Sequence, residues 1–239
     1  HLLLPPAWMA GGSTAFPLGT DELGRDLWSR LVYGARVSLI IGAASVIFAL
    51  VPGVLLGLLA AFRPTGLGAA ILRIMDILLA VPGLLLALAV VTALGPGLVN
   101  TVIAIALGAL PGHVRLACAC ARAERAREYV WASELMGASQ SRLMFRTVLP
   151  NCAGPLLVNA TLGFSSALLE VAALGFLGLG VAAPTPEWGS MLSTARDSLE
   201  RAPWLAVLPG LAILVTALSA NLVGDALRDA WDPKLRAAP

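Results

Sequence analysis

The sequence has few charged residues. Only 13% of its 239 residues are Asp, Glu, Lys or Arg, and 58% are hydrophobic, whereas about a quarter of a soluble protein is charged. The mean hydropathy is +0.85. This composition excludes an ordinary water-soluble surface and indicates a chain whose solvent is the lipid bilayer. The net charge is only +2 and is clustered, so the basic face of a nucleic-acid-binding protein is also excluded.

Cysteine and histidine are also scarce. The three cysteines are too few for a disulfide framework, and with His113 as their only nearby histidine they make a poor metal site; they are Cys118, Cys120 and Cys152. The only other histidine is His1, so the Ser–His pair of an intramembrane hydrolase is not expected. No apolar run at the start resembles a secretory signal.

Long uncharged runs predict membrane-spanning helices. A helix needs about 20 apolar residues to cross a bilayer, and the runs lack the alternating polarity of barrel strands. We therefore expect an all-α polytopic membrane helical bundle with spans at residues 37–62, 70–93, 98–117, 151–176 and 202–224. Neighbouring helices can satisfy the carbonyls freed by prolines inside these spans, namely Pro52, Pro82, Pro111 and Pro209. Gly53 and Gly57 would allow close helix packing.

Arginine and lysine predict the orientation of the spans. Eleven of the 16 basic residues fall in one alternate set of loops and five in the other, which places the 113–150 loop and the 225–239 tail in the cytoplasm. Residues 1–36 then form an external leader with an interfacial helix, and 181–201 an external loop. Because export of that polar leader would need a preceding signal, we expect a further span before His1, six in the full-length protein.

The predicted cytoplasmic loop contains a charged, glycine-bearing stretch, Leu135 to Pro150, LMGASQSRLMFRTVLP. Residues 128–139 predict a short helix, and Gly137 is placed to end it in the left-handed conformation that glycine adopts at little cost. A second short helix is expected through Leu143 to Phe145. Since Pro150 has no N–H to donate, the chain is expected to break there before the next span.

This stretch resembles the "EAA" loop of binding-protein-dependent ABC importer permeases, in which Glu-Ala-Ala, three intervening residues, a glycine and a distant Leu-Pro recur. The matching positions, with Trp131 in place of the glutamate, are Trp131, Ala132, Ser133, Gly137, Leu149 and Pro150. Four further segments look like the dipeptide, oligopeptide and nickel branch of this family, and within it like the second (C-type) permease subunit. These segments are residues 17–42, 176–192, 202–213 and 221–236.

The resemblance implies the type I importer permease fold and a set of partners. Such a chain pairs with a second, non-identical permease, two cytoplasmic ABC ATPases and an external solute-binding protein. ATP and Mg²⁺ would be bound by the ATPases, so no cofactor is expected in this chain, which also lacks the G-x-x-x-x-G-K-[ST] phosphate cradle. Helices in residues 128–150 would dock on an ATPase, and Ala132, Gly137 and Ala138 would transmit its motion.

The expected function is therefore import of dipeptides or oligopeptides across the bacterial cytoplasmic (inner) membrane, without enzymatic activity in this chain. The alternative within the same family is import of nickel or another small solute. A secondary transporter is a remote alternative, because it should show repeated halves and coupling-ion carboxylates near the midplane, whereas these spans contain few acids.

Several polar residues in the spans have open roles. Glu170 is predicted either to serve the translocation pathway or a gate, or to be a paired structural acid near the outer headgroups. We expect Asn159, Ser165 and Ser166 either to line the pathway or to form hydrogen bonds within the helix bundle. The same two alternatives hold for Thr161, Thr216, Ser219 and Asn221.

Charged residues near the span ends are expected to have structural roles. Asp76 shares a helix face with Arg73 and is predicted to pair with it, and His113 is predicted to be an interfacial cap. A cluster of charged residues in the predicted external leader has two possible roles. It either meets the binding protein or forms a solvated interfacial helix, with Trp28 and Tyr33 as headgroup anchors. Its residues are Asp21, Glu22, Arg25 and Asp26.

Overall fold

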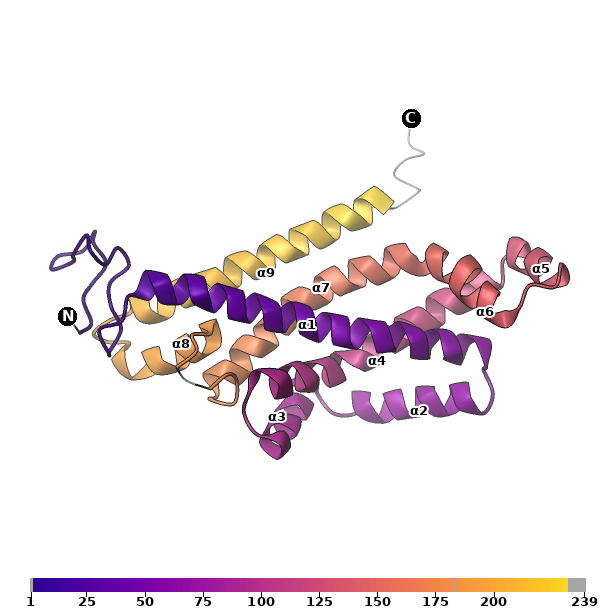
Figure 1. The fold of residues 1–239 in the computed structure, drawn as a ribbon, viewed down its shortest axis with the longest axis horizontal. Coiled ribbons are helices and arrows are strands. Elements are labelled where there is room, and N and C mark those ends of the chain that lie inside the picture. The colour runs from indigo at the N-terminus through magenta and orange to yellow at the C-terminus, as the bar shows by residue number, and fades with distance from the viewer. Residues whose placement is uncertain (1, 183, 232–239) are drawn as a thin grey trace.

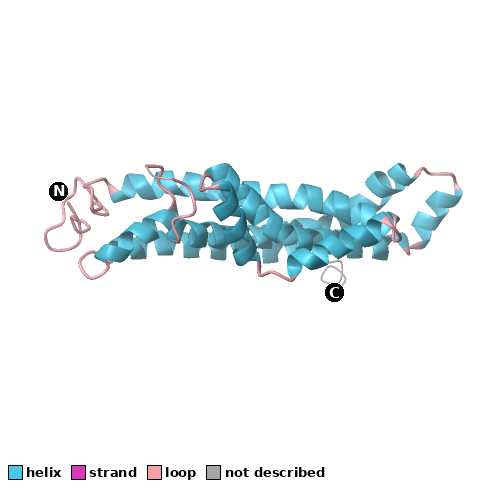
Figure 2. Ribbon diagram, turned by 90° about the horizontal axis from the view of Figure 1, so that it is seen from below, coloured by secondary structure: helices cyan, strands magenta, loops and turns pink. Residues whose placement is uncertain are grey.

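The structure is a computed structural model that describes residues 2–182 and 184–231. Its described residues form helices and loops, and their only β-contact is an isolated bridge between Thr20 and Asp26 (Figure 2). The elements are α1 (Leu27–Phe62), α2 (Leu67–Leu79), α3 (Gly83–Leu94), α4 (Leu98–Arg125), α5 (Glu128–Leu135), α6 (Gln140–Arg142), the π-helix η1 (Leu143–Val148), α7 (Leu149–Phe176), α8 (Trp188–Ala195), the 3₁₀-helix η2 (Arg196–Ser198) and α9 (Trp204–Trp231).

The long helices α1, α4, α7 and α9 run along one axis, so the molecule is an elongated bundle (Figure 1). Four helices, with α6, η1 and α7 counted as one, are long and apolar enough to cross a membrane, and the bent pair α2 and α3 makes a fifth span if counted as one. The N-terminal segment and α8 gather at one end, and α5 and α6 project from the other. The predicted all-α membrane bundle is confirmed.

The first helix corrects the predicted leader. α1 begins at Leu27, not at residue 37, because the Asp26 carboxylate accepts the Ser29 N–H at 3.0 Å and caps its N-terminus. No separate interfacial helix occurs in the described part of residues 1–36, and Trp28 and Tyr33 lie in the first turns of α1. The charged residues Arg30 and Arg36 lie inside α1 and do not end it. The helix therefore begins before the uncharged run predicted to cross the membrane.

The second predicted span is broken. α2 and α3 meet at a bend of 90°, and the break falls on Ala80 to Pro82, with Pro82 at the N-cap of α3. Proline lacks the N–H that would continue the hydrogen-bond ladder. Pro52, Pro111 and Pro209 remain inside helices as predicted, so proline alone does not distinguish an uninterrupted helix from a break.

Two boundaries of the predicted cytoplasmic loop are also corrected. α4 continues through residue 113 to Arg125, because the arginines of its last turns lie beyond the apolar core and favour the helix C-terminus. The chain does not break at Pro150. The Leu149 N–H instead bonds to the Met144 carbonyl in a π-helical turn, and Pro150 falls in the first turn of α7, where an N–H is not required.

The long helices α1 and α4 approach each other closely. A Cβ atom added at Gly53 would lie 2.6 Å from His113 Cβ, and one added at Gly57 would lie 2.6 Å from both Ala117 Cβ and the Val114 carbonyl oxygen. Real Cβ atoms do not approach so closely, so these positions require glycine. The prediction that the two glycines allow close helix packing is confirmed.

The end of the bundle that carries α8 is held by a buried carboxylate, Glu187. It is only 1% exposed, caps α8 by accepting the N–H groups of Gly189 and Ser190 at 2.7 and 2.8 Å, and accepts the Ser38 hydroxyl of α1 at 3.1 Å. Burial raises the pKa of the Glu187 carboxyl, and these three hydrogen bonds oppose the rise. Gly175 of α7 leaves the space that the carboxylate fills. The predicted external loop 181–201 therefore contains a folded connection between α1, α7 and α8.

Replacement of Gly57 by alanine should destabilise the protein. The added methyl group would overlap α4 and force the helices apart, at a cost of about 1–3 kcal/mol. The matched control is Gly112→Ala in α4, where an added Cβ meets nothing within 4 Å. Thermal unfolding of both variants in detergent should show a lower midpoint for Gly57→Ala alone. Equal midpoints would contradict the packing argument.

Candidate functional site

The segment 128–150, here called the coupling segment, is the most distinctive local structure. Its helix α5 ends in a Schellman motif, in which the Gly137 N–H donates to the Glu134 carbonyl at 2.9 Å and the Ala138 N–H to the Ser133 carbonyl at 3.1 Å. Gly137 has φ +86°, the left-handed value predicted from the sequence. The chain therefore reverses at Gly137 and returns toward the bundle.

The base of the coupling segment is fixed in the bundle core. Val130, Leu143 and Val148 are at most 2% exposed and belong to a cluster that also contains Leu58 of α1 and Val114 of α4. The segment therefore packs on α4 and α7 and shares one buried cluster with α1.

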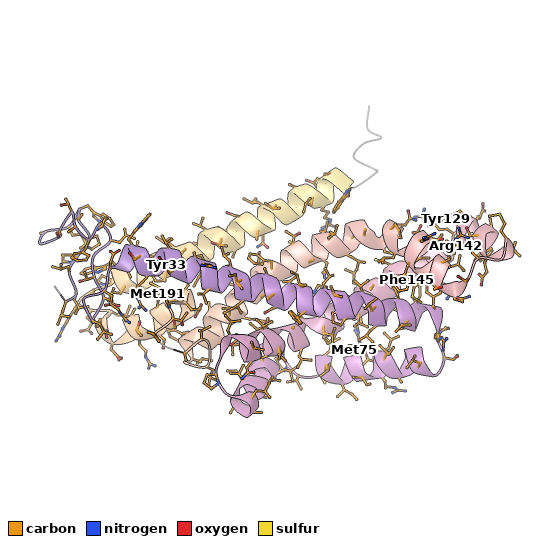
Figure 3. All side chains as sticks on the ribbon, viewed as in Figure 1. Tyr33, Met75, Tyr129, Arg142, Phe145 and Met191 are labelled. Carbon is orange, nitrogen blue, oxygen red and sulfur yellow. The ribbon has the colours of Figure 1, made fainter. Side chains whose placement is uncertain are left out.

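Polar contacts reinforce this attachment. The Tyr129 hydroxyl donates to the Glu124 carboxylate at the end of α4, and Arg127 pairs with the same carboxylate at 3.2 Å. Burial and the hydrogen bond to Glu124 raise the pKa of Tyr129 to about 12. Arg125 donates to the Ala61 carbonyl at 2.8 Å and so links α4 to the end of α1. Figure 3 shows Tyr129, Arg142 and Phe145 at this end of the bundle, and Tyr33 and Met191 toward the other.

The tip of the coupling segment presents exposed apolar side chains. Leu135 is 89% exposed, Met136 82% and Trp131 59%. Side chains of this kind at the aqueous end of a membrane protein favour contact with another protein. Sequence reasoning selected Trp131 but missed Leu135 and Met136. Their position directly before the reversing glycine is the signal that could have identified them.

The remaining predicted residues of the segment divide between surface and core. Ala132 is exposed, whereas Ser133 is half-buried and its hydroxyl bonds to the Tyr129 carbonyl. Ala138 is half-buried and packs on the core cluster with Leu149, while Pro150 is exposed. The predicted positions therefore lie in one segment, in which Ala138 faces inward and Ala132 faces outward.

Most of the polar candidates in the spans are occupied by hydrogen bonds inside the bundle. The Ser165 hydroxyl of α7 donates to the Ala217 carbonyl of α9 at 3.0 Å, and Asn159 lies 3.1 Å from His113 Nδ1. Three hydroxyls bond to carbonyls of their own helices, those of Thr161, Thr216 and Ser219. Of the two alternatives, internal bonding therefore applies to these five residues.

Glu170 and Ser166 line a small cavity, whereas Asn159 lines a separate groove between α7 and α9. The cavity holds about 160 Å³ and lies between α1, α4 and α7, with Ser45 and His113 also in its wall. Glu170 makes no ion pair with any described residue. Its carboxylate lies instead near the start of α3, 3.7 Å from where a Gly83 Cβ would be. His113 is 3% exposed in α4, so its prediction as an interfacial cap is wrong.

Two charge predictions are also corrected. Asp76 pairs with Arg115 of α4, not with Arg73, because the packed α4 brings a competing arginine within reach. The external acids are occupied by structural contacts. Asp21 pairs with Arg25 at 2.7 Å, and the Glu22 carboxylate accepts the Ser198 hydroxyl at 2.6 Å.

Comparison with known proteins agrees with this geometry. Residues 53–237 match the family described as "Binding-protein-dependent transport system inner membrane component". The chain is 62% identical over 237 residues to the di/tripeptide transport system permease protein DppC of Pseudomonas aeruginosa (strain UCBPP-PA14), covering 99% of this chain and 78% of the relative. It is 52% identical over 235 residues to the dipeptide transport system permease protein DppC of Escherichia coli (strain K12), with coverage of 98% and 78%.

Among solved structures, the fold resembles a chain of the MetNI methionine ABC transporter in inward-facing conformations. The TM-score is 0.70 at 21% sequence identity, and the match covers 85% of this chain and 96% of the other. At that identity the likeness shows the fold alone. Together with the family match and the close relatives, it establishes that this chain is a multi-pass inner-membrane component belonging to the binding-protein-dependent transport system family of ABC importer permeases.

Proposed function

We propose that this chain is one permease subunit of an ATP-driven importer of dipeptides and related short peptides. The substrate class is supported by the printed function of its relatives, which are 62% and 52% identical over almost the whole chain. The mechanism is supported by the coupling segment, whose exposed apolar tip stands on a base fixed in the α1–α4 core.

To import a solute, this chain would need partner subunits that complete the pore, deliver the solute and hydrolyse ATP. A second, non-identical permease completes the pore, an external binding protein delivers the solute, and two cytoplasmic ATPases bind ATP and Mg²⁺. The tip residues Trp131, Leu135 and Met136 dock on an ATPase. Closure of the ATPases on nucleotide then pushes the tip, and the buried base passes the displacement to α1 and α4.

The cavity lined by Glu170 and Ser166 is a second element of this proposal. Glu170 and Ser166 serve the pathway or its gate, because they face a shared cavity at the crossing of three helices. Asn159 acts indirectly, by holding His113 in the cavity wall. Ser165 holds α7 against α9 and is not a pathway residue.

Uptake by the reconstituted transporter tests the substrate and the partners. With the second permease, both ATPases and the binding protein in vesicles, ATP-dependent accumulation of a labelled dipeptide is expected. Omission of the second permease should abolish it. Accumulation without that subunit would contradict the proposed pore, and uptake of Ni²⁺ in place of dipeptide would assign the chain to the nickel alternative.

Removal of the apolar tip should weaken attachment of the ATPases without destabilising the bundle. In the double variant Leu135→Ser, Met136→Ser, both altered side chains are more than 80% exposed, so thermal stability should be unchanged. Each lost apolar contact is worth about 1.5–3 kcal/mol when fully buried. Co-purification of the ATPases through a tag on this chain should therefore fall sharply. Undiminished co-purification would exclude the tip as the docking site.

The variant Gly137→Val should uncouple ATP hydrolysis from uptake. A β-branched residue at φ +86° is strained by about 1–3 kcal/mol, and the open space around Gly137 excludes a steric clash as the cause. The matched control is Ala126→Val, exposed and at an ordinary φ of −77°. Uptake should fall about tenfold, a factor equivalent to about 1.4 kcal/mol, in Gly137→Val alone, at unchanged expression. Normal uptake would remove the coupling role of the turn.

A further inference from the structure

A groove of about 770 Å³ lies beside the coupling segment, where α1 ends and α2 begins. Its apolar wall comes from α1, α2 and η1 and includes Leu55, Leu59, Leu67 and Phe145. Two arginines also line it, Arg63 directly after α1 and Arg125 at the end of α4. Leu55, Leu67 and Phe145 are 43%, 53% and 47% exposed, so the groove is open along its side.

The two arginines make the end of the groove beside the C-termini of α1 and α4 positive. Arg63 is exposed and has no ion-pair partner among the described residues. Arg125 is held by its bond to the Ala61 carbonyl and by stacking 4.4 Å from the centroid of the Phe62 ring, which leaves most of its five N–H donors for another acceptor. No Asp or Glu lines the groove. Glu124, next to Arg125 in the sequence, is paired with Arg127, and Glu134 accepts a hydrogen bond at 3.4 Å from the amide of Gln140 in the groove wall.

The charges and the apolar wall are separated along the membrane normal. Arg63 follows the last residue of α1, at the cytoplasmic headgroup level predicted by the distribution of basic residues. Leu59 and Leu55 lie one and two turns deeper along α1, about 6 and 12 Å from Arg63 along the helix axis. The groove thus offers cations at headgroup depth and an apolar wall directly below.

We propose that this groove is a binding site for an acidic phospholipid of the cytoplasmic leaflet, such as phosphatidylglycerol. The phosphate lies between Arg63 and Arg125, and an acyl chain covers Leu55 and Leu59. Basic pockets between membrane helices on the cytoplasmic side suit such headgroups. An acidic surface of an ATPase is the other anion available at this end, but it cannot follow the groove below the headgroups.

The position of the lipid gives it a role in the movement of the coupling segment. Met144 and Phe145 of η1 line the groove opposite Leu67 of α2, so a bound lipid joins the α1–α2 connection to the base of the coupling segment. This site is independent of which solute is transported.

Photolabelling tests the site in the whole transporter. The full chain with its partner subunits is placed in nanodiscs that contain phosphatidylglycerol or phosphatidylcholine with a photoreactive group on the acyl chain, and labelled peptides are mapped by mass spectrometry. Phosphatidylglycerol should label residues 55–67 and 140–145. In Arg63→Gln this labelling should fall about fivefold, the factor that corresponds to about 1 kcal/mol per arginine near an anionic surface.

The matched control is Arg122→Gln, which removes an exposed cytoplasmic arginine of α4 outside the groove and should leave labelling unchanged. Because Arg63 is exposed and unpaired, its replacement should keep the thermal stability of the complex. Equal labelling by phosphatidylcholine, or an equal loss in Arg122→Gln, would overturn the proposal. Labelling of the groove in the isolated chain but not in the whole transporter would also overturn it and would assign the groove to an ATPase.

Discussion

The structure depends on the close approach of α1 and α4 at Gly53 and Gly57. Without side chains at these two positions, the α1 backbone comes into direct contact with His113, Val114 and Ala117 of α4. In lipid, where the hydrophobic effect does not drive helices together, such close packing is a main source of association. The coupling segment, the bent pair α2–α3 and the cavity with Glu170 all border this pair of helices.

The two ends of the bundle are built differently. At the end that carries α8, the buried Glu187 carboxylate joins α8 to Ser38 of α1, so the connection between α7 and α9 is folded against the spans. At the opposite end, Val130 and Leu143 are buried while Leu135 and Met136 are exposed. One end therefore closes on itself, and the other presents a fixed base with a free apolar tip.

Local features of the fold could be predicted from the sequence because they depend on neighbouring residues. Uncharged runs identified the spans, and Gly137 identified the end of α5 and its positive φ. Features that depend on distant partners could not. Ser38 and Glu187 are far apart in the sequence, and Asp76 pairs with Arg115 because α4 packs beside α2. Pro82 breaks its span while Pro52 does not, a difference set by packing and not by the residue itself.

The central claim is that the tip of the coupling segment and the α1–α4 pair move as one body. Spin labels at Glu128, an exposed residue at the start of α5 outside the docking tip, and at Ile47, an exposed residue of α1, would report the distance between them in the assembled transporter, without nucleotide and with ATP bound. If the segment and the helix pair move together, this distance stays the same while the distance from Ile47 to a label on the second permease changes. A change in the Glu128–Ile47 distance with ATP would contradict the claim.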